Sequence, residues 1–256
     1  MRTPDELREA VEAHLASLRL APELGRLEEV LRYALEPGGK RVRPVLCLAV
    51  AEAAGGRIEE ALPAAAALEL VHAFSLVHDD LPALDDDDER RGRPSAHVTF
   101  GEAAALLAGD ALLVEAFRLV LGYDDPALGR ELAEATAAMI GGQYRDVTGD
   151  LADLAEVERL KTGSLLSAAV GLGLRAARVP EAEQRPWRAF GAELGLLFQA
   201  VDDLLDGDGF AVMLGAEGAR RLADEAAGRA RERLDAIPAD TSTLRELVDA
   251  LAVRTA

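Results

Sequence analysis

Apolar side chains recur every three or four positions through most of the chain, which is the spacing of an amphipathic helix. This pattern predicts helices over residues 4–18 and 22–36. Long Ala/Leu-rich stretches between glycine or proline turns predict further helices at 45–54, 61–80, 99–121, 127–145, from about 156, and at 187–206. Strong helix formers dominate and β-branched clusters are short, so the chain is predicted to be all-α. Nothing in the composition divides residues 1–256, and a single domain is expected.

Two of these segments are apolar on nearly every face and end in aspartates. The segment 61–80 ends in Asp79 and Asp80, and the segment 187–206 contains Asp202, Asp203 and Asp206. A helix that is apolar all round is expected to be buried. Carboxylates one helical turn apart repel each other unless a cation neutralises them, and Mg²⁺ prefers carboxylate oxygens. The two clusters therefore predict a metal site.

The first cluster continues as a dense acidic run from Asp79 to Glu89. Most acidic runs are solvated loops without a ligand, and that alternative stays open for this run taken alone. Asp79 and Asp85 are six positions apart, so an ideal helix would place them on different faces. Pro82 interrupts the turn between them and allows both carboxylates to approach one ion.

Lysine occurs at two positions, Lys40 and Lys161, in a chain with 28 basic residues. Each lies in a short polar motif that contains glycine, GGKRVRP and KTG. A compact ammonium beside exposed glycine backbone and the start of a helix suits a phosphate group. A solvated basic turn is the alternative, but the choice of lysine at both motifs favours phosphate binding.

Charge and hydropathy exclude several other classes of protein. The formal net charge of −18 disfavours nucleic-acid binding. No uninterrupted apolar run reaches the roughly 18 to 20 residues of a membrane span, and residues 1–10 lack a signal-peptide pattern. A soluble, cytoplasmic protein is expected. Cys47 lies in VLCLAV and is interpreted as a buried apolar residue and not as a nucleophile.

Seven motifs occur in one order along the chain: GGKRVRP at 38–44, DDLPALD at 79–85, RRGRPSAH at 90–97, FGEAAALLAGDAL at 100–112, GGQYRD at 141–146, KTG at 161–163 and FQAVDDLLD at 198–206. With these motifs the chain resembles the trans-isoprenyl diphosphate synthases over nearly its whole length, particularly bacterial farnesyl and geranylgeranyl diphosphate synthases. The resemblance implies antiparallel helices around a deep cavity, with the two aspartate motifs facing each other across its mouth. It also implies a homodimer.

The resemblance further implies which residues act. Asp79, Asp85 and Asp202 would hold three Mg²⁺ ions on an allylic diphosphate, with support from Asp80, Asp203 and Asp206. The same diphosphate would be bound by Arg90, Lys161, Thr162 and Gln199, and isopentenyl diphosphate would be bound by Lys40, Arg43, His72 and Arg91. Asp79, Asp85, Lys161 and Asp202 are then the expected catalytic residues. The implied reaction is Mg²⁺-assisted ionisation of the allylic diphosphate followed by head-to-tail condensation, which requires no protein nucleophile.

Product length is expected to depend on the floor of the cavity. Helical geometry places Ser75 one turn below Asp79 and His72 on the same stripe. In the resembled family an aromatic residue five positions before the first aspartate limits growth near fifteen carbons, and that position is Phe74. Farnesyl diphosphate is therefore the favoured product, with the twenty-carbon product as the alternative.

One stretch departs from the family pattern. DGDGFAVMLGAEGARR lacks the lysine-containing lid that follows the second aspartate motif, as though residues were missing between about Asp206 and Phe210. Either the lid is short or a segment is omitted between Gly209 and Phe210. Two other functions stay open: a terpene cyclase, against which the separate GGKRVRP site argues, and a non-catalytic regulatory subunit of a prenyl synthase, against which two intact aspartate motifs argue.

Overall fold

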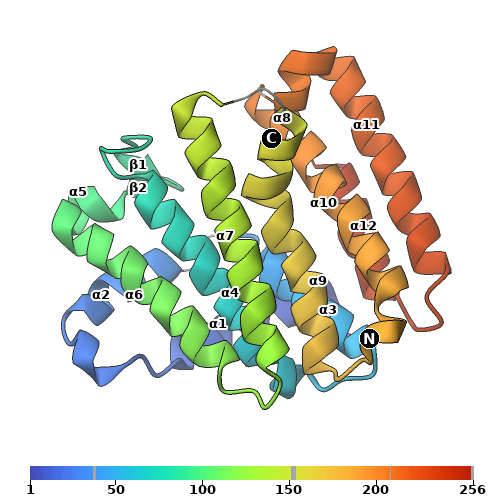
Figure 1. Ribbon diagram of the computed structural model, residues 1–256, viewed down its shortest axis with the longest axis horizontal. Coiled ribbons are helices and arrows are strands. Elements are labelled where there is room, and N and C mark those ends of the chain that lie inside the picture. Colours follow the sequence, from blue (N-terminus) through green and yellow to red (C-terminus); the bar gives the residue numbers. More distant parts are fainter. Residues whose placement is uncertain (37–38, 151–153, 208, 255–256) are drawn as a thin grey trace.

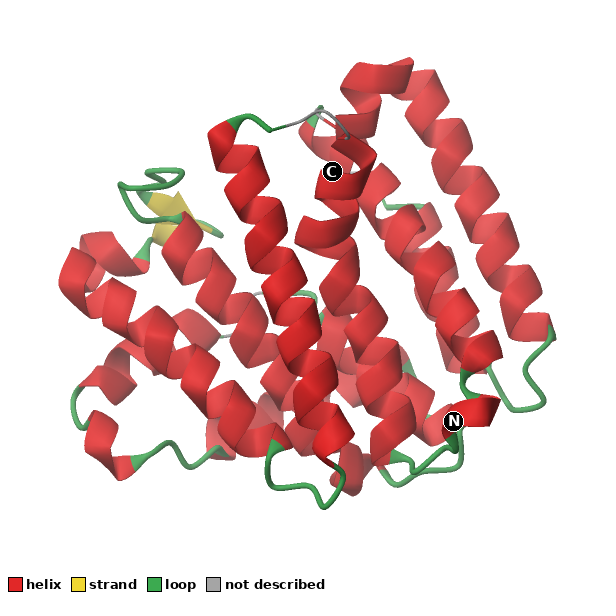
Figure 2. Ribbon diagram, in the orientation of Figure 1, coloured by secondary structure: helices red, strands yellow, loops and turns green. Residues whose placement is uncertain are grey.

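The computed structural model describes residues 1–36, 39–150, 154–207 and 209–254, and these residues form a bundle of helices (Figure 1). Apart from a two-stranded hairpin at one end of the bundle, the regular structure is helical throughout the described chain (Figure 2). The predicted all-α fold is confirmed. Pro37 and Gly38, which follow the helix predicted over 22–36, lie outside the described residues.

The helices follow one another in the order α1 (Pro4–Ser17), α2 (Leu27–Leu35), α3 (Val42–Ala53), α4 (Ile58–Asp79), α5 (Ala96–Phe100), α6 (Glu102–Val120), α7 (Pro126–Thr148), α8 (Leu154–Glu158), α9 (Ser164–Ala176), α10 (Arg185–Asp206), α11 (Gly209–Asp235) and α12 (Ser242–Ala252). Short 3₁₀ turns precede α2 and α10, and a π-helical turn, Arg159–Gly163, joins α8 to α9. The hairpin strands are β1 (Glu89–Arg90) and β2 (Arg93–Pro94).

The two helices predicted to be buried lie inside the bundle. α4 packs against α3, α6 and α9, and α10 packs against α9 and α11. One continuous hydrophobic core runs from Leu7 on α1 to Leu251 on α12. Of the described helices, α4 is long and apolar enough to cross a membrane, yet 67% of its apolar window is buried, as in the core helix of a bundle.

Two predicted helices are each divided by a glycine in the left-handed region. The helix expected over 22–36 breaks at Gly25, where φ is 51°, and α2 begins two residues later. The helix expected over 99–121 breaks at Gly101, where φ is 87°, which separates α5 from α6. Glycine adopts these angles without steric cost, so the breaks were not visible in the apolar spacing.

Small residues of α6 provide a close contact with α4. Ala105 is fully buried, and Gly109 faces His78 of α4 so closely that a Cβ atom would lie 2.2 Å from its Nε2. Gly101 is not part of this surface, because a Cβ atom there would meet nothing within 4 Å.

The segment that departs from the family pattern turns directly into a long helix. α11 includes both Gly209 and Phe210, and it kinks at Gly215, where φ is 72°. Asp208 lies outside the described residues. The lysine-containing lid of the family pattern is not present in the sequence between α10 and α11.

Candidate active site

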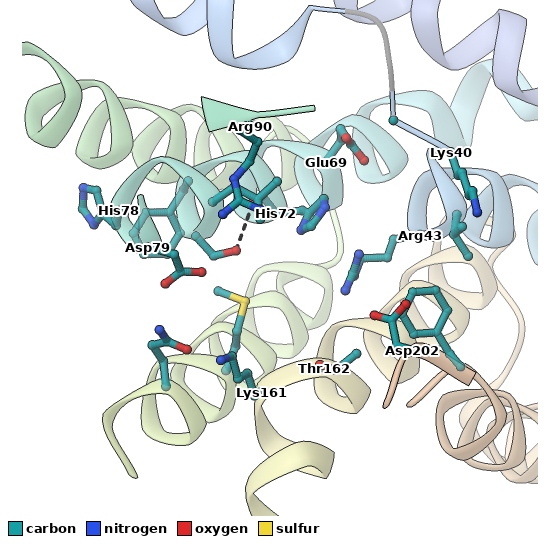
Figure 3. Close-up of a pocket in the computed structure, with 18 of the residues that line it drawn as sticks. Lys40, Arg43, Glu69, His72, His78, Asp79, Arg90, Lys161, Thr162 and Asp202 are labelled. Atoms are coloured by element: carbon teal, nitrogen blue, oxygen red, sulfur yellow. Dashed lines mark hydrogen bonds between the residues drawn. The ribbon is translucent and has the colours of Figure 1, made fainter. Parts of the chain in front are cut away.

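A cavity of about 840 Å³ lies where α4 and α10 end. Residues from the start of α3, from the hairpin, from α7, from the π-helical turn and from the C-terminal segment complete its wall. Asp79 and Asp202 both line it, and Figure 3 shows them on opposite sides with Lys161 and Thr162 between them on a third wall. The two aspartate clusters thus share one cavity, although 123 positions separate these residues in the chain.

Most of the site residues expected from the sequence line this cavity. Those present in its wall are Lys40, Arg43, His72, Phe74, Ser75, Asp79, Arg90, Arg91, Lys161, Thr162, Asp202 and Asp206. Four expected residues lie outside the wall: Asp80, Asp85, Asp203 and Gln199.

The loop after α4 returns toward the end of the helix. The Asp85 backbone N–H donates a hydrogen bond of 2.9 Å to the Asp79 carbonyl oxygen, so the chain folds back around Pro82 as expected. Asp85 itself is exposed beside the cavity. Burial raises the pKa of Asp79 to about 6; Lys161 opposes this shift and Asp85 adds to it. The site therefore favours the neutral form of the Asp79 carboxyl group unless a cation binds beside it.

Asp80 binds Arg90 and lies outside the cavity wall, unlike Asp79. It is buried and accepts a 2.7 Å hydrogen bond from Arg90 Nε and a 2.5 Å contact from Arg90 Nη2. Burial raises the pKa of Asp80, and the bond from Arg90 opposes that shift. Arg90 is thereby held with its guanidinium at the cavity (Figure 3).

In the second aspartate cluster, two aspartates line the cavity and one lies outside its wall. Asp202 and Asp206 face the cavity, and Asp202 accepts a 2.7 Å hydrogen bond from Arg254 Nη1. Asp203 points the other way, is 2% exposed, and accepts a 2.7 Å hydrogen bond from the backbone N–H of Phe210. It also accepts a hydrogen bond from Gln199, whose Nε2 lies 2.7 Å from Glu158 Oε2. The structure therefore places Asp203 and Gln199 in the joint between α8, α10 and the start of α11, away from the cavity wall.

A group of cations lies on the same side of the cavity as Asp202, away from Asp79 (Figure 3). Lys40 and Arg43 come from the start of α3, and Arg91 comes from the turn of the hairpin. Burial lowers the pKa of all three. Arg43 lies over the ring of Phe198 at 5.6 Å, and its buried Nε has no hydrogen-bond partner among the described residues. A buried hydrogen-bond donor without a partner, surrounded by other cations, suits an anionic ligand.

Arg91 lies in the strained turn between β1 and β2. Arg91 and Gly92 have φ of 56° and 75°, which are the angles of a two-residue turn that matches strand twist. Arg91 then lies on the backbone of Gly39, where a Cβ atom would come within 2.7 Å of its Nη1. A non-glycine residue in the left-handed region is uncommon and occurs often at functional sites.

Arg41, the middle cation of GGKRVRP, is structural. Its φ of 48° turns it away from Lys40, and its buried guanidinium bonds Glu12 Oε1 at 2.7 Å, Glu69, and the Leu35 carbonyl oxygen at 2.6 Å. The charge of Arg41 is therefore neutralised by carboxylates from α1 and α4, unlike the charges of Lys40 and Arg43. These contacts fix the turn that presents Lys40 and Arg43.

Lys161 and Thr162 project from the π-helical turn. Burial by itself lowers the pKa of Lys161, but Asp146, Asp79 and Asp85 raise it overall. Its Nζ lies 2.5 Å from Asp146 Oδ2 on α7. Gly142 allows α7 to approach, since a Cβ atom there would lie 2.5 Å from the Lys161 backbone nitrogen. π-turns within helices are frequent at functional sites.

Phe74 and Ser75 both line the cavity below Asp79, so the structure brings together both of the residues expected at its floor. Phe74 is 7% exposed, and its ring meets the ring of His78 edge to face at 5.0 Å.

The wall also contains residues that sequence reasoning did not assign to the site, and Gln143 and Arg254 are two of them. Gln143 of GGQYRD has both amide atoms buried without a partner in the described residues. Arg254 reaches the cavity from beyond α12 and lies 6.0 Å from the Phe198 ring. The glycine-rich motif could have indicated Gln143, whereas no local pattern marks Arg254.

The carboxylates of Asp79 and Asp202 suit a divalent cation whose remaining ligands come from a bound substrate. Among the described residues, no three His, Cys, Asp or Glu side chains stand close enough to hold an ion by themselves. Asp79 forms no ion pair within that part of the chain and has a pKa of about 6. Mg²⁺ is commonly held by one or two carboxylates together with phosphate oxygens of a substrate, which matches this arrangement.

An all-α bundle with facing carboxylates and two groups of cations in one cavity has the charge arrangement needed to bind diphosphates with a divalent cation. A sequence profile of the polyprenyl synthetase family matches residues 25–219, and the chain belongs to this family. Membership identifies a prenyltransferase of isoprenoid synthesis and indicates dependence on a divalent metal.

Three relatives illustrate the match. The chain is 34% identical to the farnesyl diphosphate synthase of Bacillus subtilis (strain 168) over 262 positions, covering 89% of this chain and 88% of that protein. It is 43% identical to the geranylgeranyl diphosphate synthase of Cyanophora paradoxa over 191 positions, covering 69% of this chain and 64% of that protein, which is less than two thirds of the relative. The crystal structure of a geranyltransferase from Legionella pneumophila superposes with a TM-score of 0.88 at 32% identity, covering 98% and 96% of the two chains.

The alignment with the B. subtilis protein is longer than the 256 residues of this chain, so that relative has internal residues that this chain lacks.

Proposed function

We propose that the protein condenses isopentenyl diphosphate with an allylic diphosphate, with three Mg²⁺ ions, and that its main product is farnesyl diphosphate. The observation that supports this most is the presence of two separate anion sites in one cavity. Asp79, Arg90 and Lys161 lie toward one side, and Lys40 and Arg43 lie toward the other (Figure 3). Arg91 also lines the cavity, and its charge acts on Arg43.

The first side would bind the allylic substrate. Bound Mg²⁺ supplies positive charge to the diphosphate that leaves. Arg90, fixed by Asp80, and Lys161, fixed by Asp146, add two oriented cations to the same group. Because both side chains are held before substrate arrives, little reorganisation accompanies ionisation.

The second side would bind isopentenyl diphosphate. The pKa of His72 is well below its ordinary value because of burial and the nearby Arg43 and Arg91. His72 is therefore neutral at physiological pH and can donate one hydrogen bond to a phosphate oxygen without adding charge.

The reaction then proceeds between two bound substrates. The C1–O bond of the allylic diphosphate breaks, and the electron pair leaves with pyrophosphate. The double bond of isopentenyl diphosphate forms a new C–C bond to C1, and the proton lost from C2 of the isopentenyl unit passes to the released pyrophosphate. The cavity below Asp79, closed by Phe74, would receive the growing chain.

A product assay with radiolabelled isopentenyl diphosphate tests this proposal. Dimethylallyl, geranyl and farnesyl diphosphates are offered separately with Mg²⁺, and label is expected in a fifteen-carbon product from the first two. A terpene cyclase would consume the allylic substrate without taking up label. A regulatory subunit would show no turnover alone and would change the products of an added active synthase. Either result would refute the proposal.

We also propose a homodimer that forms through α6. Four large apolar side chains along α6 and at its end are exposed by 47 to 69%, namely Leu106, Leu107, Val114 and Leu121. Exposed apolar residues gathered along one helix favour association. Light scattering on wild type and on Leu107→Lys/Val114→Lys tests this, with the double variant expected to be monomeric.

A further inference from the structure

Phe74, the proposed floor of the cavity, is connected to α6 through His78. Phe74 of α4 meets the ring of His78, one turn later, with centroids 5.0 Å apart and planes at 75°. This edge-to-face geometry is the favoured one for ring pairs, so the position of His78 restrains the rotation of Phe74.

His78 is anchored in turn by α6. Its Nε2 lies 3.0 Å from the Leu106 carbonyl oxygen. A carbonyl can only accept, so His78 Nε2 carries the proton and donates. The imidazole thus bridges the two helices and cannot rotate without losing this bond.

Gly109 makes room for the bridge. A Cβ atom at this position would lie 2.2 Å from His78 Nε2 and 2.3 Å from its Cδ2. No side chain larger than hydrogen is compatible with the observed place of the imidazole. Gly109 is therefore a steric requirement for the pair formed by His78 and Phe74.

We infer that His78 and Gly109 determine product length by fixing the ring of Phe74 across the cavity floor. His78 is a positioning residue in this inference, which rests on the proposed elongation activity. Releasing the imidazole lets the Phe74 ring turn aside, which deepens the cavity and permits one further condensation.

The test compares products from dimethylallyl diphosphate with excess isopentenyl diphosphate. His78→Ala and Gly109→Ala are each expected to raise the ratio of twenty-carbon to fifteen-carbon product by roughly threefold to tenfold, the effect of losing one aromatic pair. The matched control is Gly228→Ala on α11, where a Cβ atom meets nothing within 4 Å, and its ratio should equal that of wild type.

The double variant His78→Ala/Gly109→Ala decides whether the two residues act together. If Gly109 acts through His78, the double variant gives the same ratio as His78→Ala alone. Unchanged ratios in the single variants, or effects that multiply in the double variant, would overturn the inference. If His78→Ala is inactive, Gly109→Ala decides by itself because Gly109 is not in the cavity wall. Absence of turnover in wild type would refute the proposed function, which is a different outcome from turnover with unchanged ratios.

Discussion

Asp79 is expected to destabilise the metal-free fold at neutral pH, and Asp79→Asn should remove that cost. Burial raises the pKa of Asp79 from 3.8 to about 6 in the folded protein. Each pKa unit corresponds to 1.36 kcal/mol, so a shift of about two units is worth roughly 3 kcal/mol.

The direction of the pH dependence follows from the raised pKa. Below pH 3.8 Asp79 is protonated in both the folded and the unfolded state, and it adds no penalty. As the pH rises through 6 the unfolded state is ionised freely while the folded state resists ionisation, so stability is lost. An asparagine does not titrate, and Asp79→Asn should therefore be more stable than wild type by about 3 kcal/mol at pH 8 and nearly equal to it near pH 4.

Urea unfolding of the metal-free proteins at both pH values measures this difference. Asp224→Asn, which changes an exposed aspartate on α11, is the control and should leave the pH dependence as in wild type. Mg²⁺ with inorganic pyrophosphate should stabilise wild type more than Asp79→Asn at pH 8, because a cation relieves the buried charge. A stability difference that is the same at pH 4 and pH 8 would refute the assignment of this cost to ionisation of Asp79.

Three further changes test other contacts of the site. Phe74→Ala should lengthen the main product to twenty carbons or more, and an unchanged chain length in the product assay would exclude Phe74 as the floor. Arg254 forms a half-buried ion pair with Asp202, worth about 1 kcal/mol, which competes with a metal ion for the carboxylate. Arg254→Gln should therefore tighten Mn²⁺ binding by about fivefold in an electron paramagnetic resonance titration. Unchanged affinity would show that the pair does not oppose the metal. Asp203→Ala should lower the unfolding free energy by about 2 kcal/mol, because Phe210 N–H loses a buried acceptor, and calorimetry that shows no loss of stability would contradict the structural role given to Asp203.

The amino-acid sequence by itself determined the helical class and the burial of α4 and α10. With the family resemblance it also indicated twelve of the residues in the cavity wall. Apolar spacing is a local property, so it located most helices, although it missed the glycine breaks at Gly25 and Gly101. The motifs identified the family, which the comparisons confirm.

Tertiary structure decided what each polar side chain of those motifs contacts. Adjacent aspartates proved different: Asp79 faces the cavity while Asp80 anchors Arg90, and Asp202 faces it while Asp203 bonds the start of α11.

Long-range pairs depended on the packing as well. Arg254 reaches Asp202 from 52 positions away, and Arg41 turns to Glu12 and Glu69. The direction of a side chain depends on which helix lies beside it, and segments distant in the chain come together through packing of the whole core. Local residue patterns indicate the period of a helix, but they carry no information about which other helix will lie beside it.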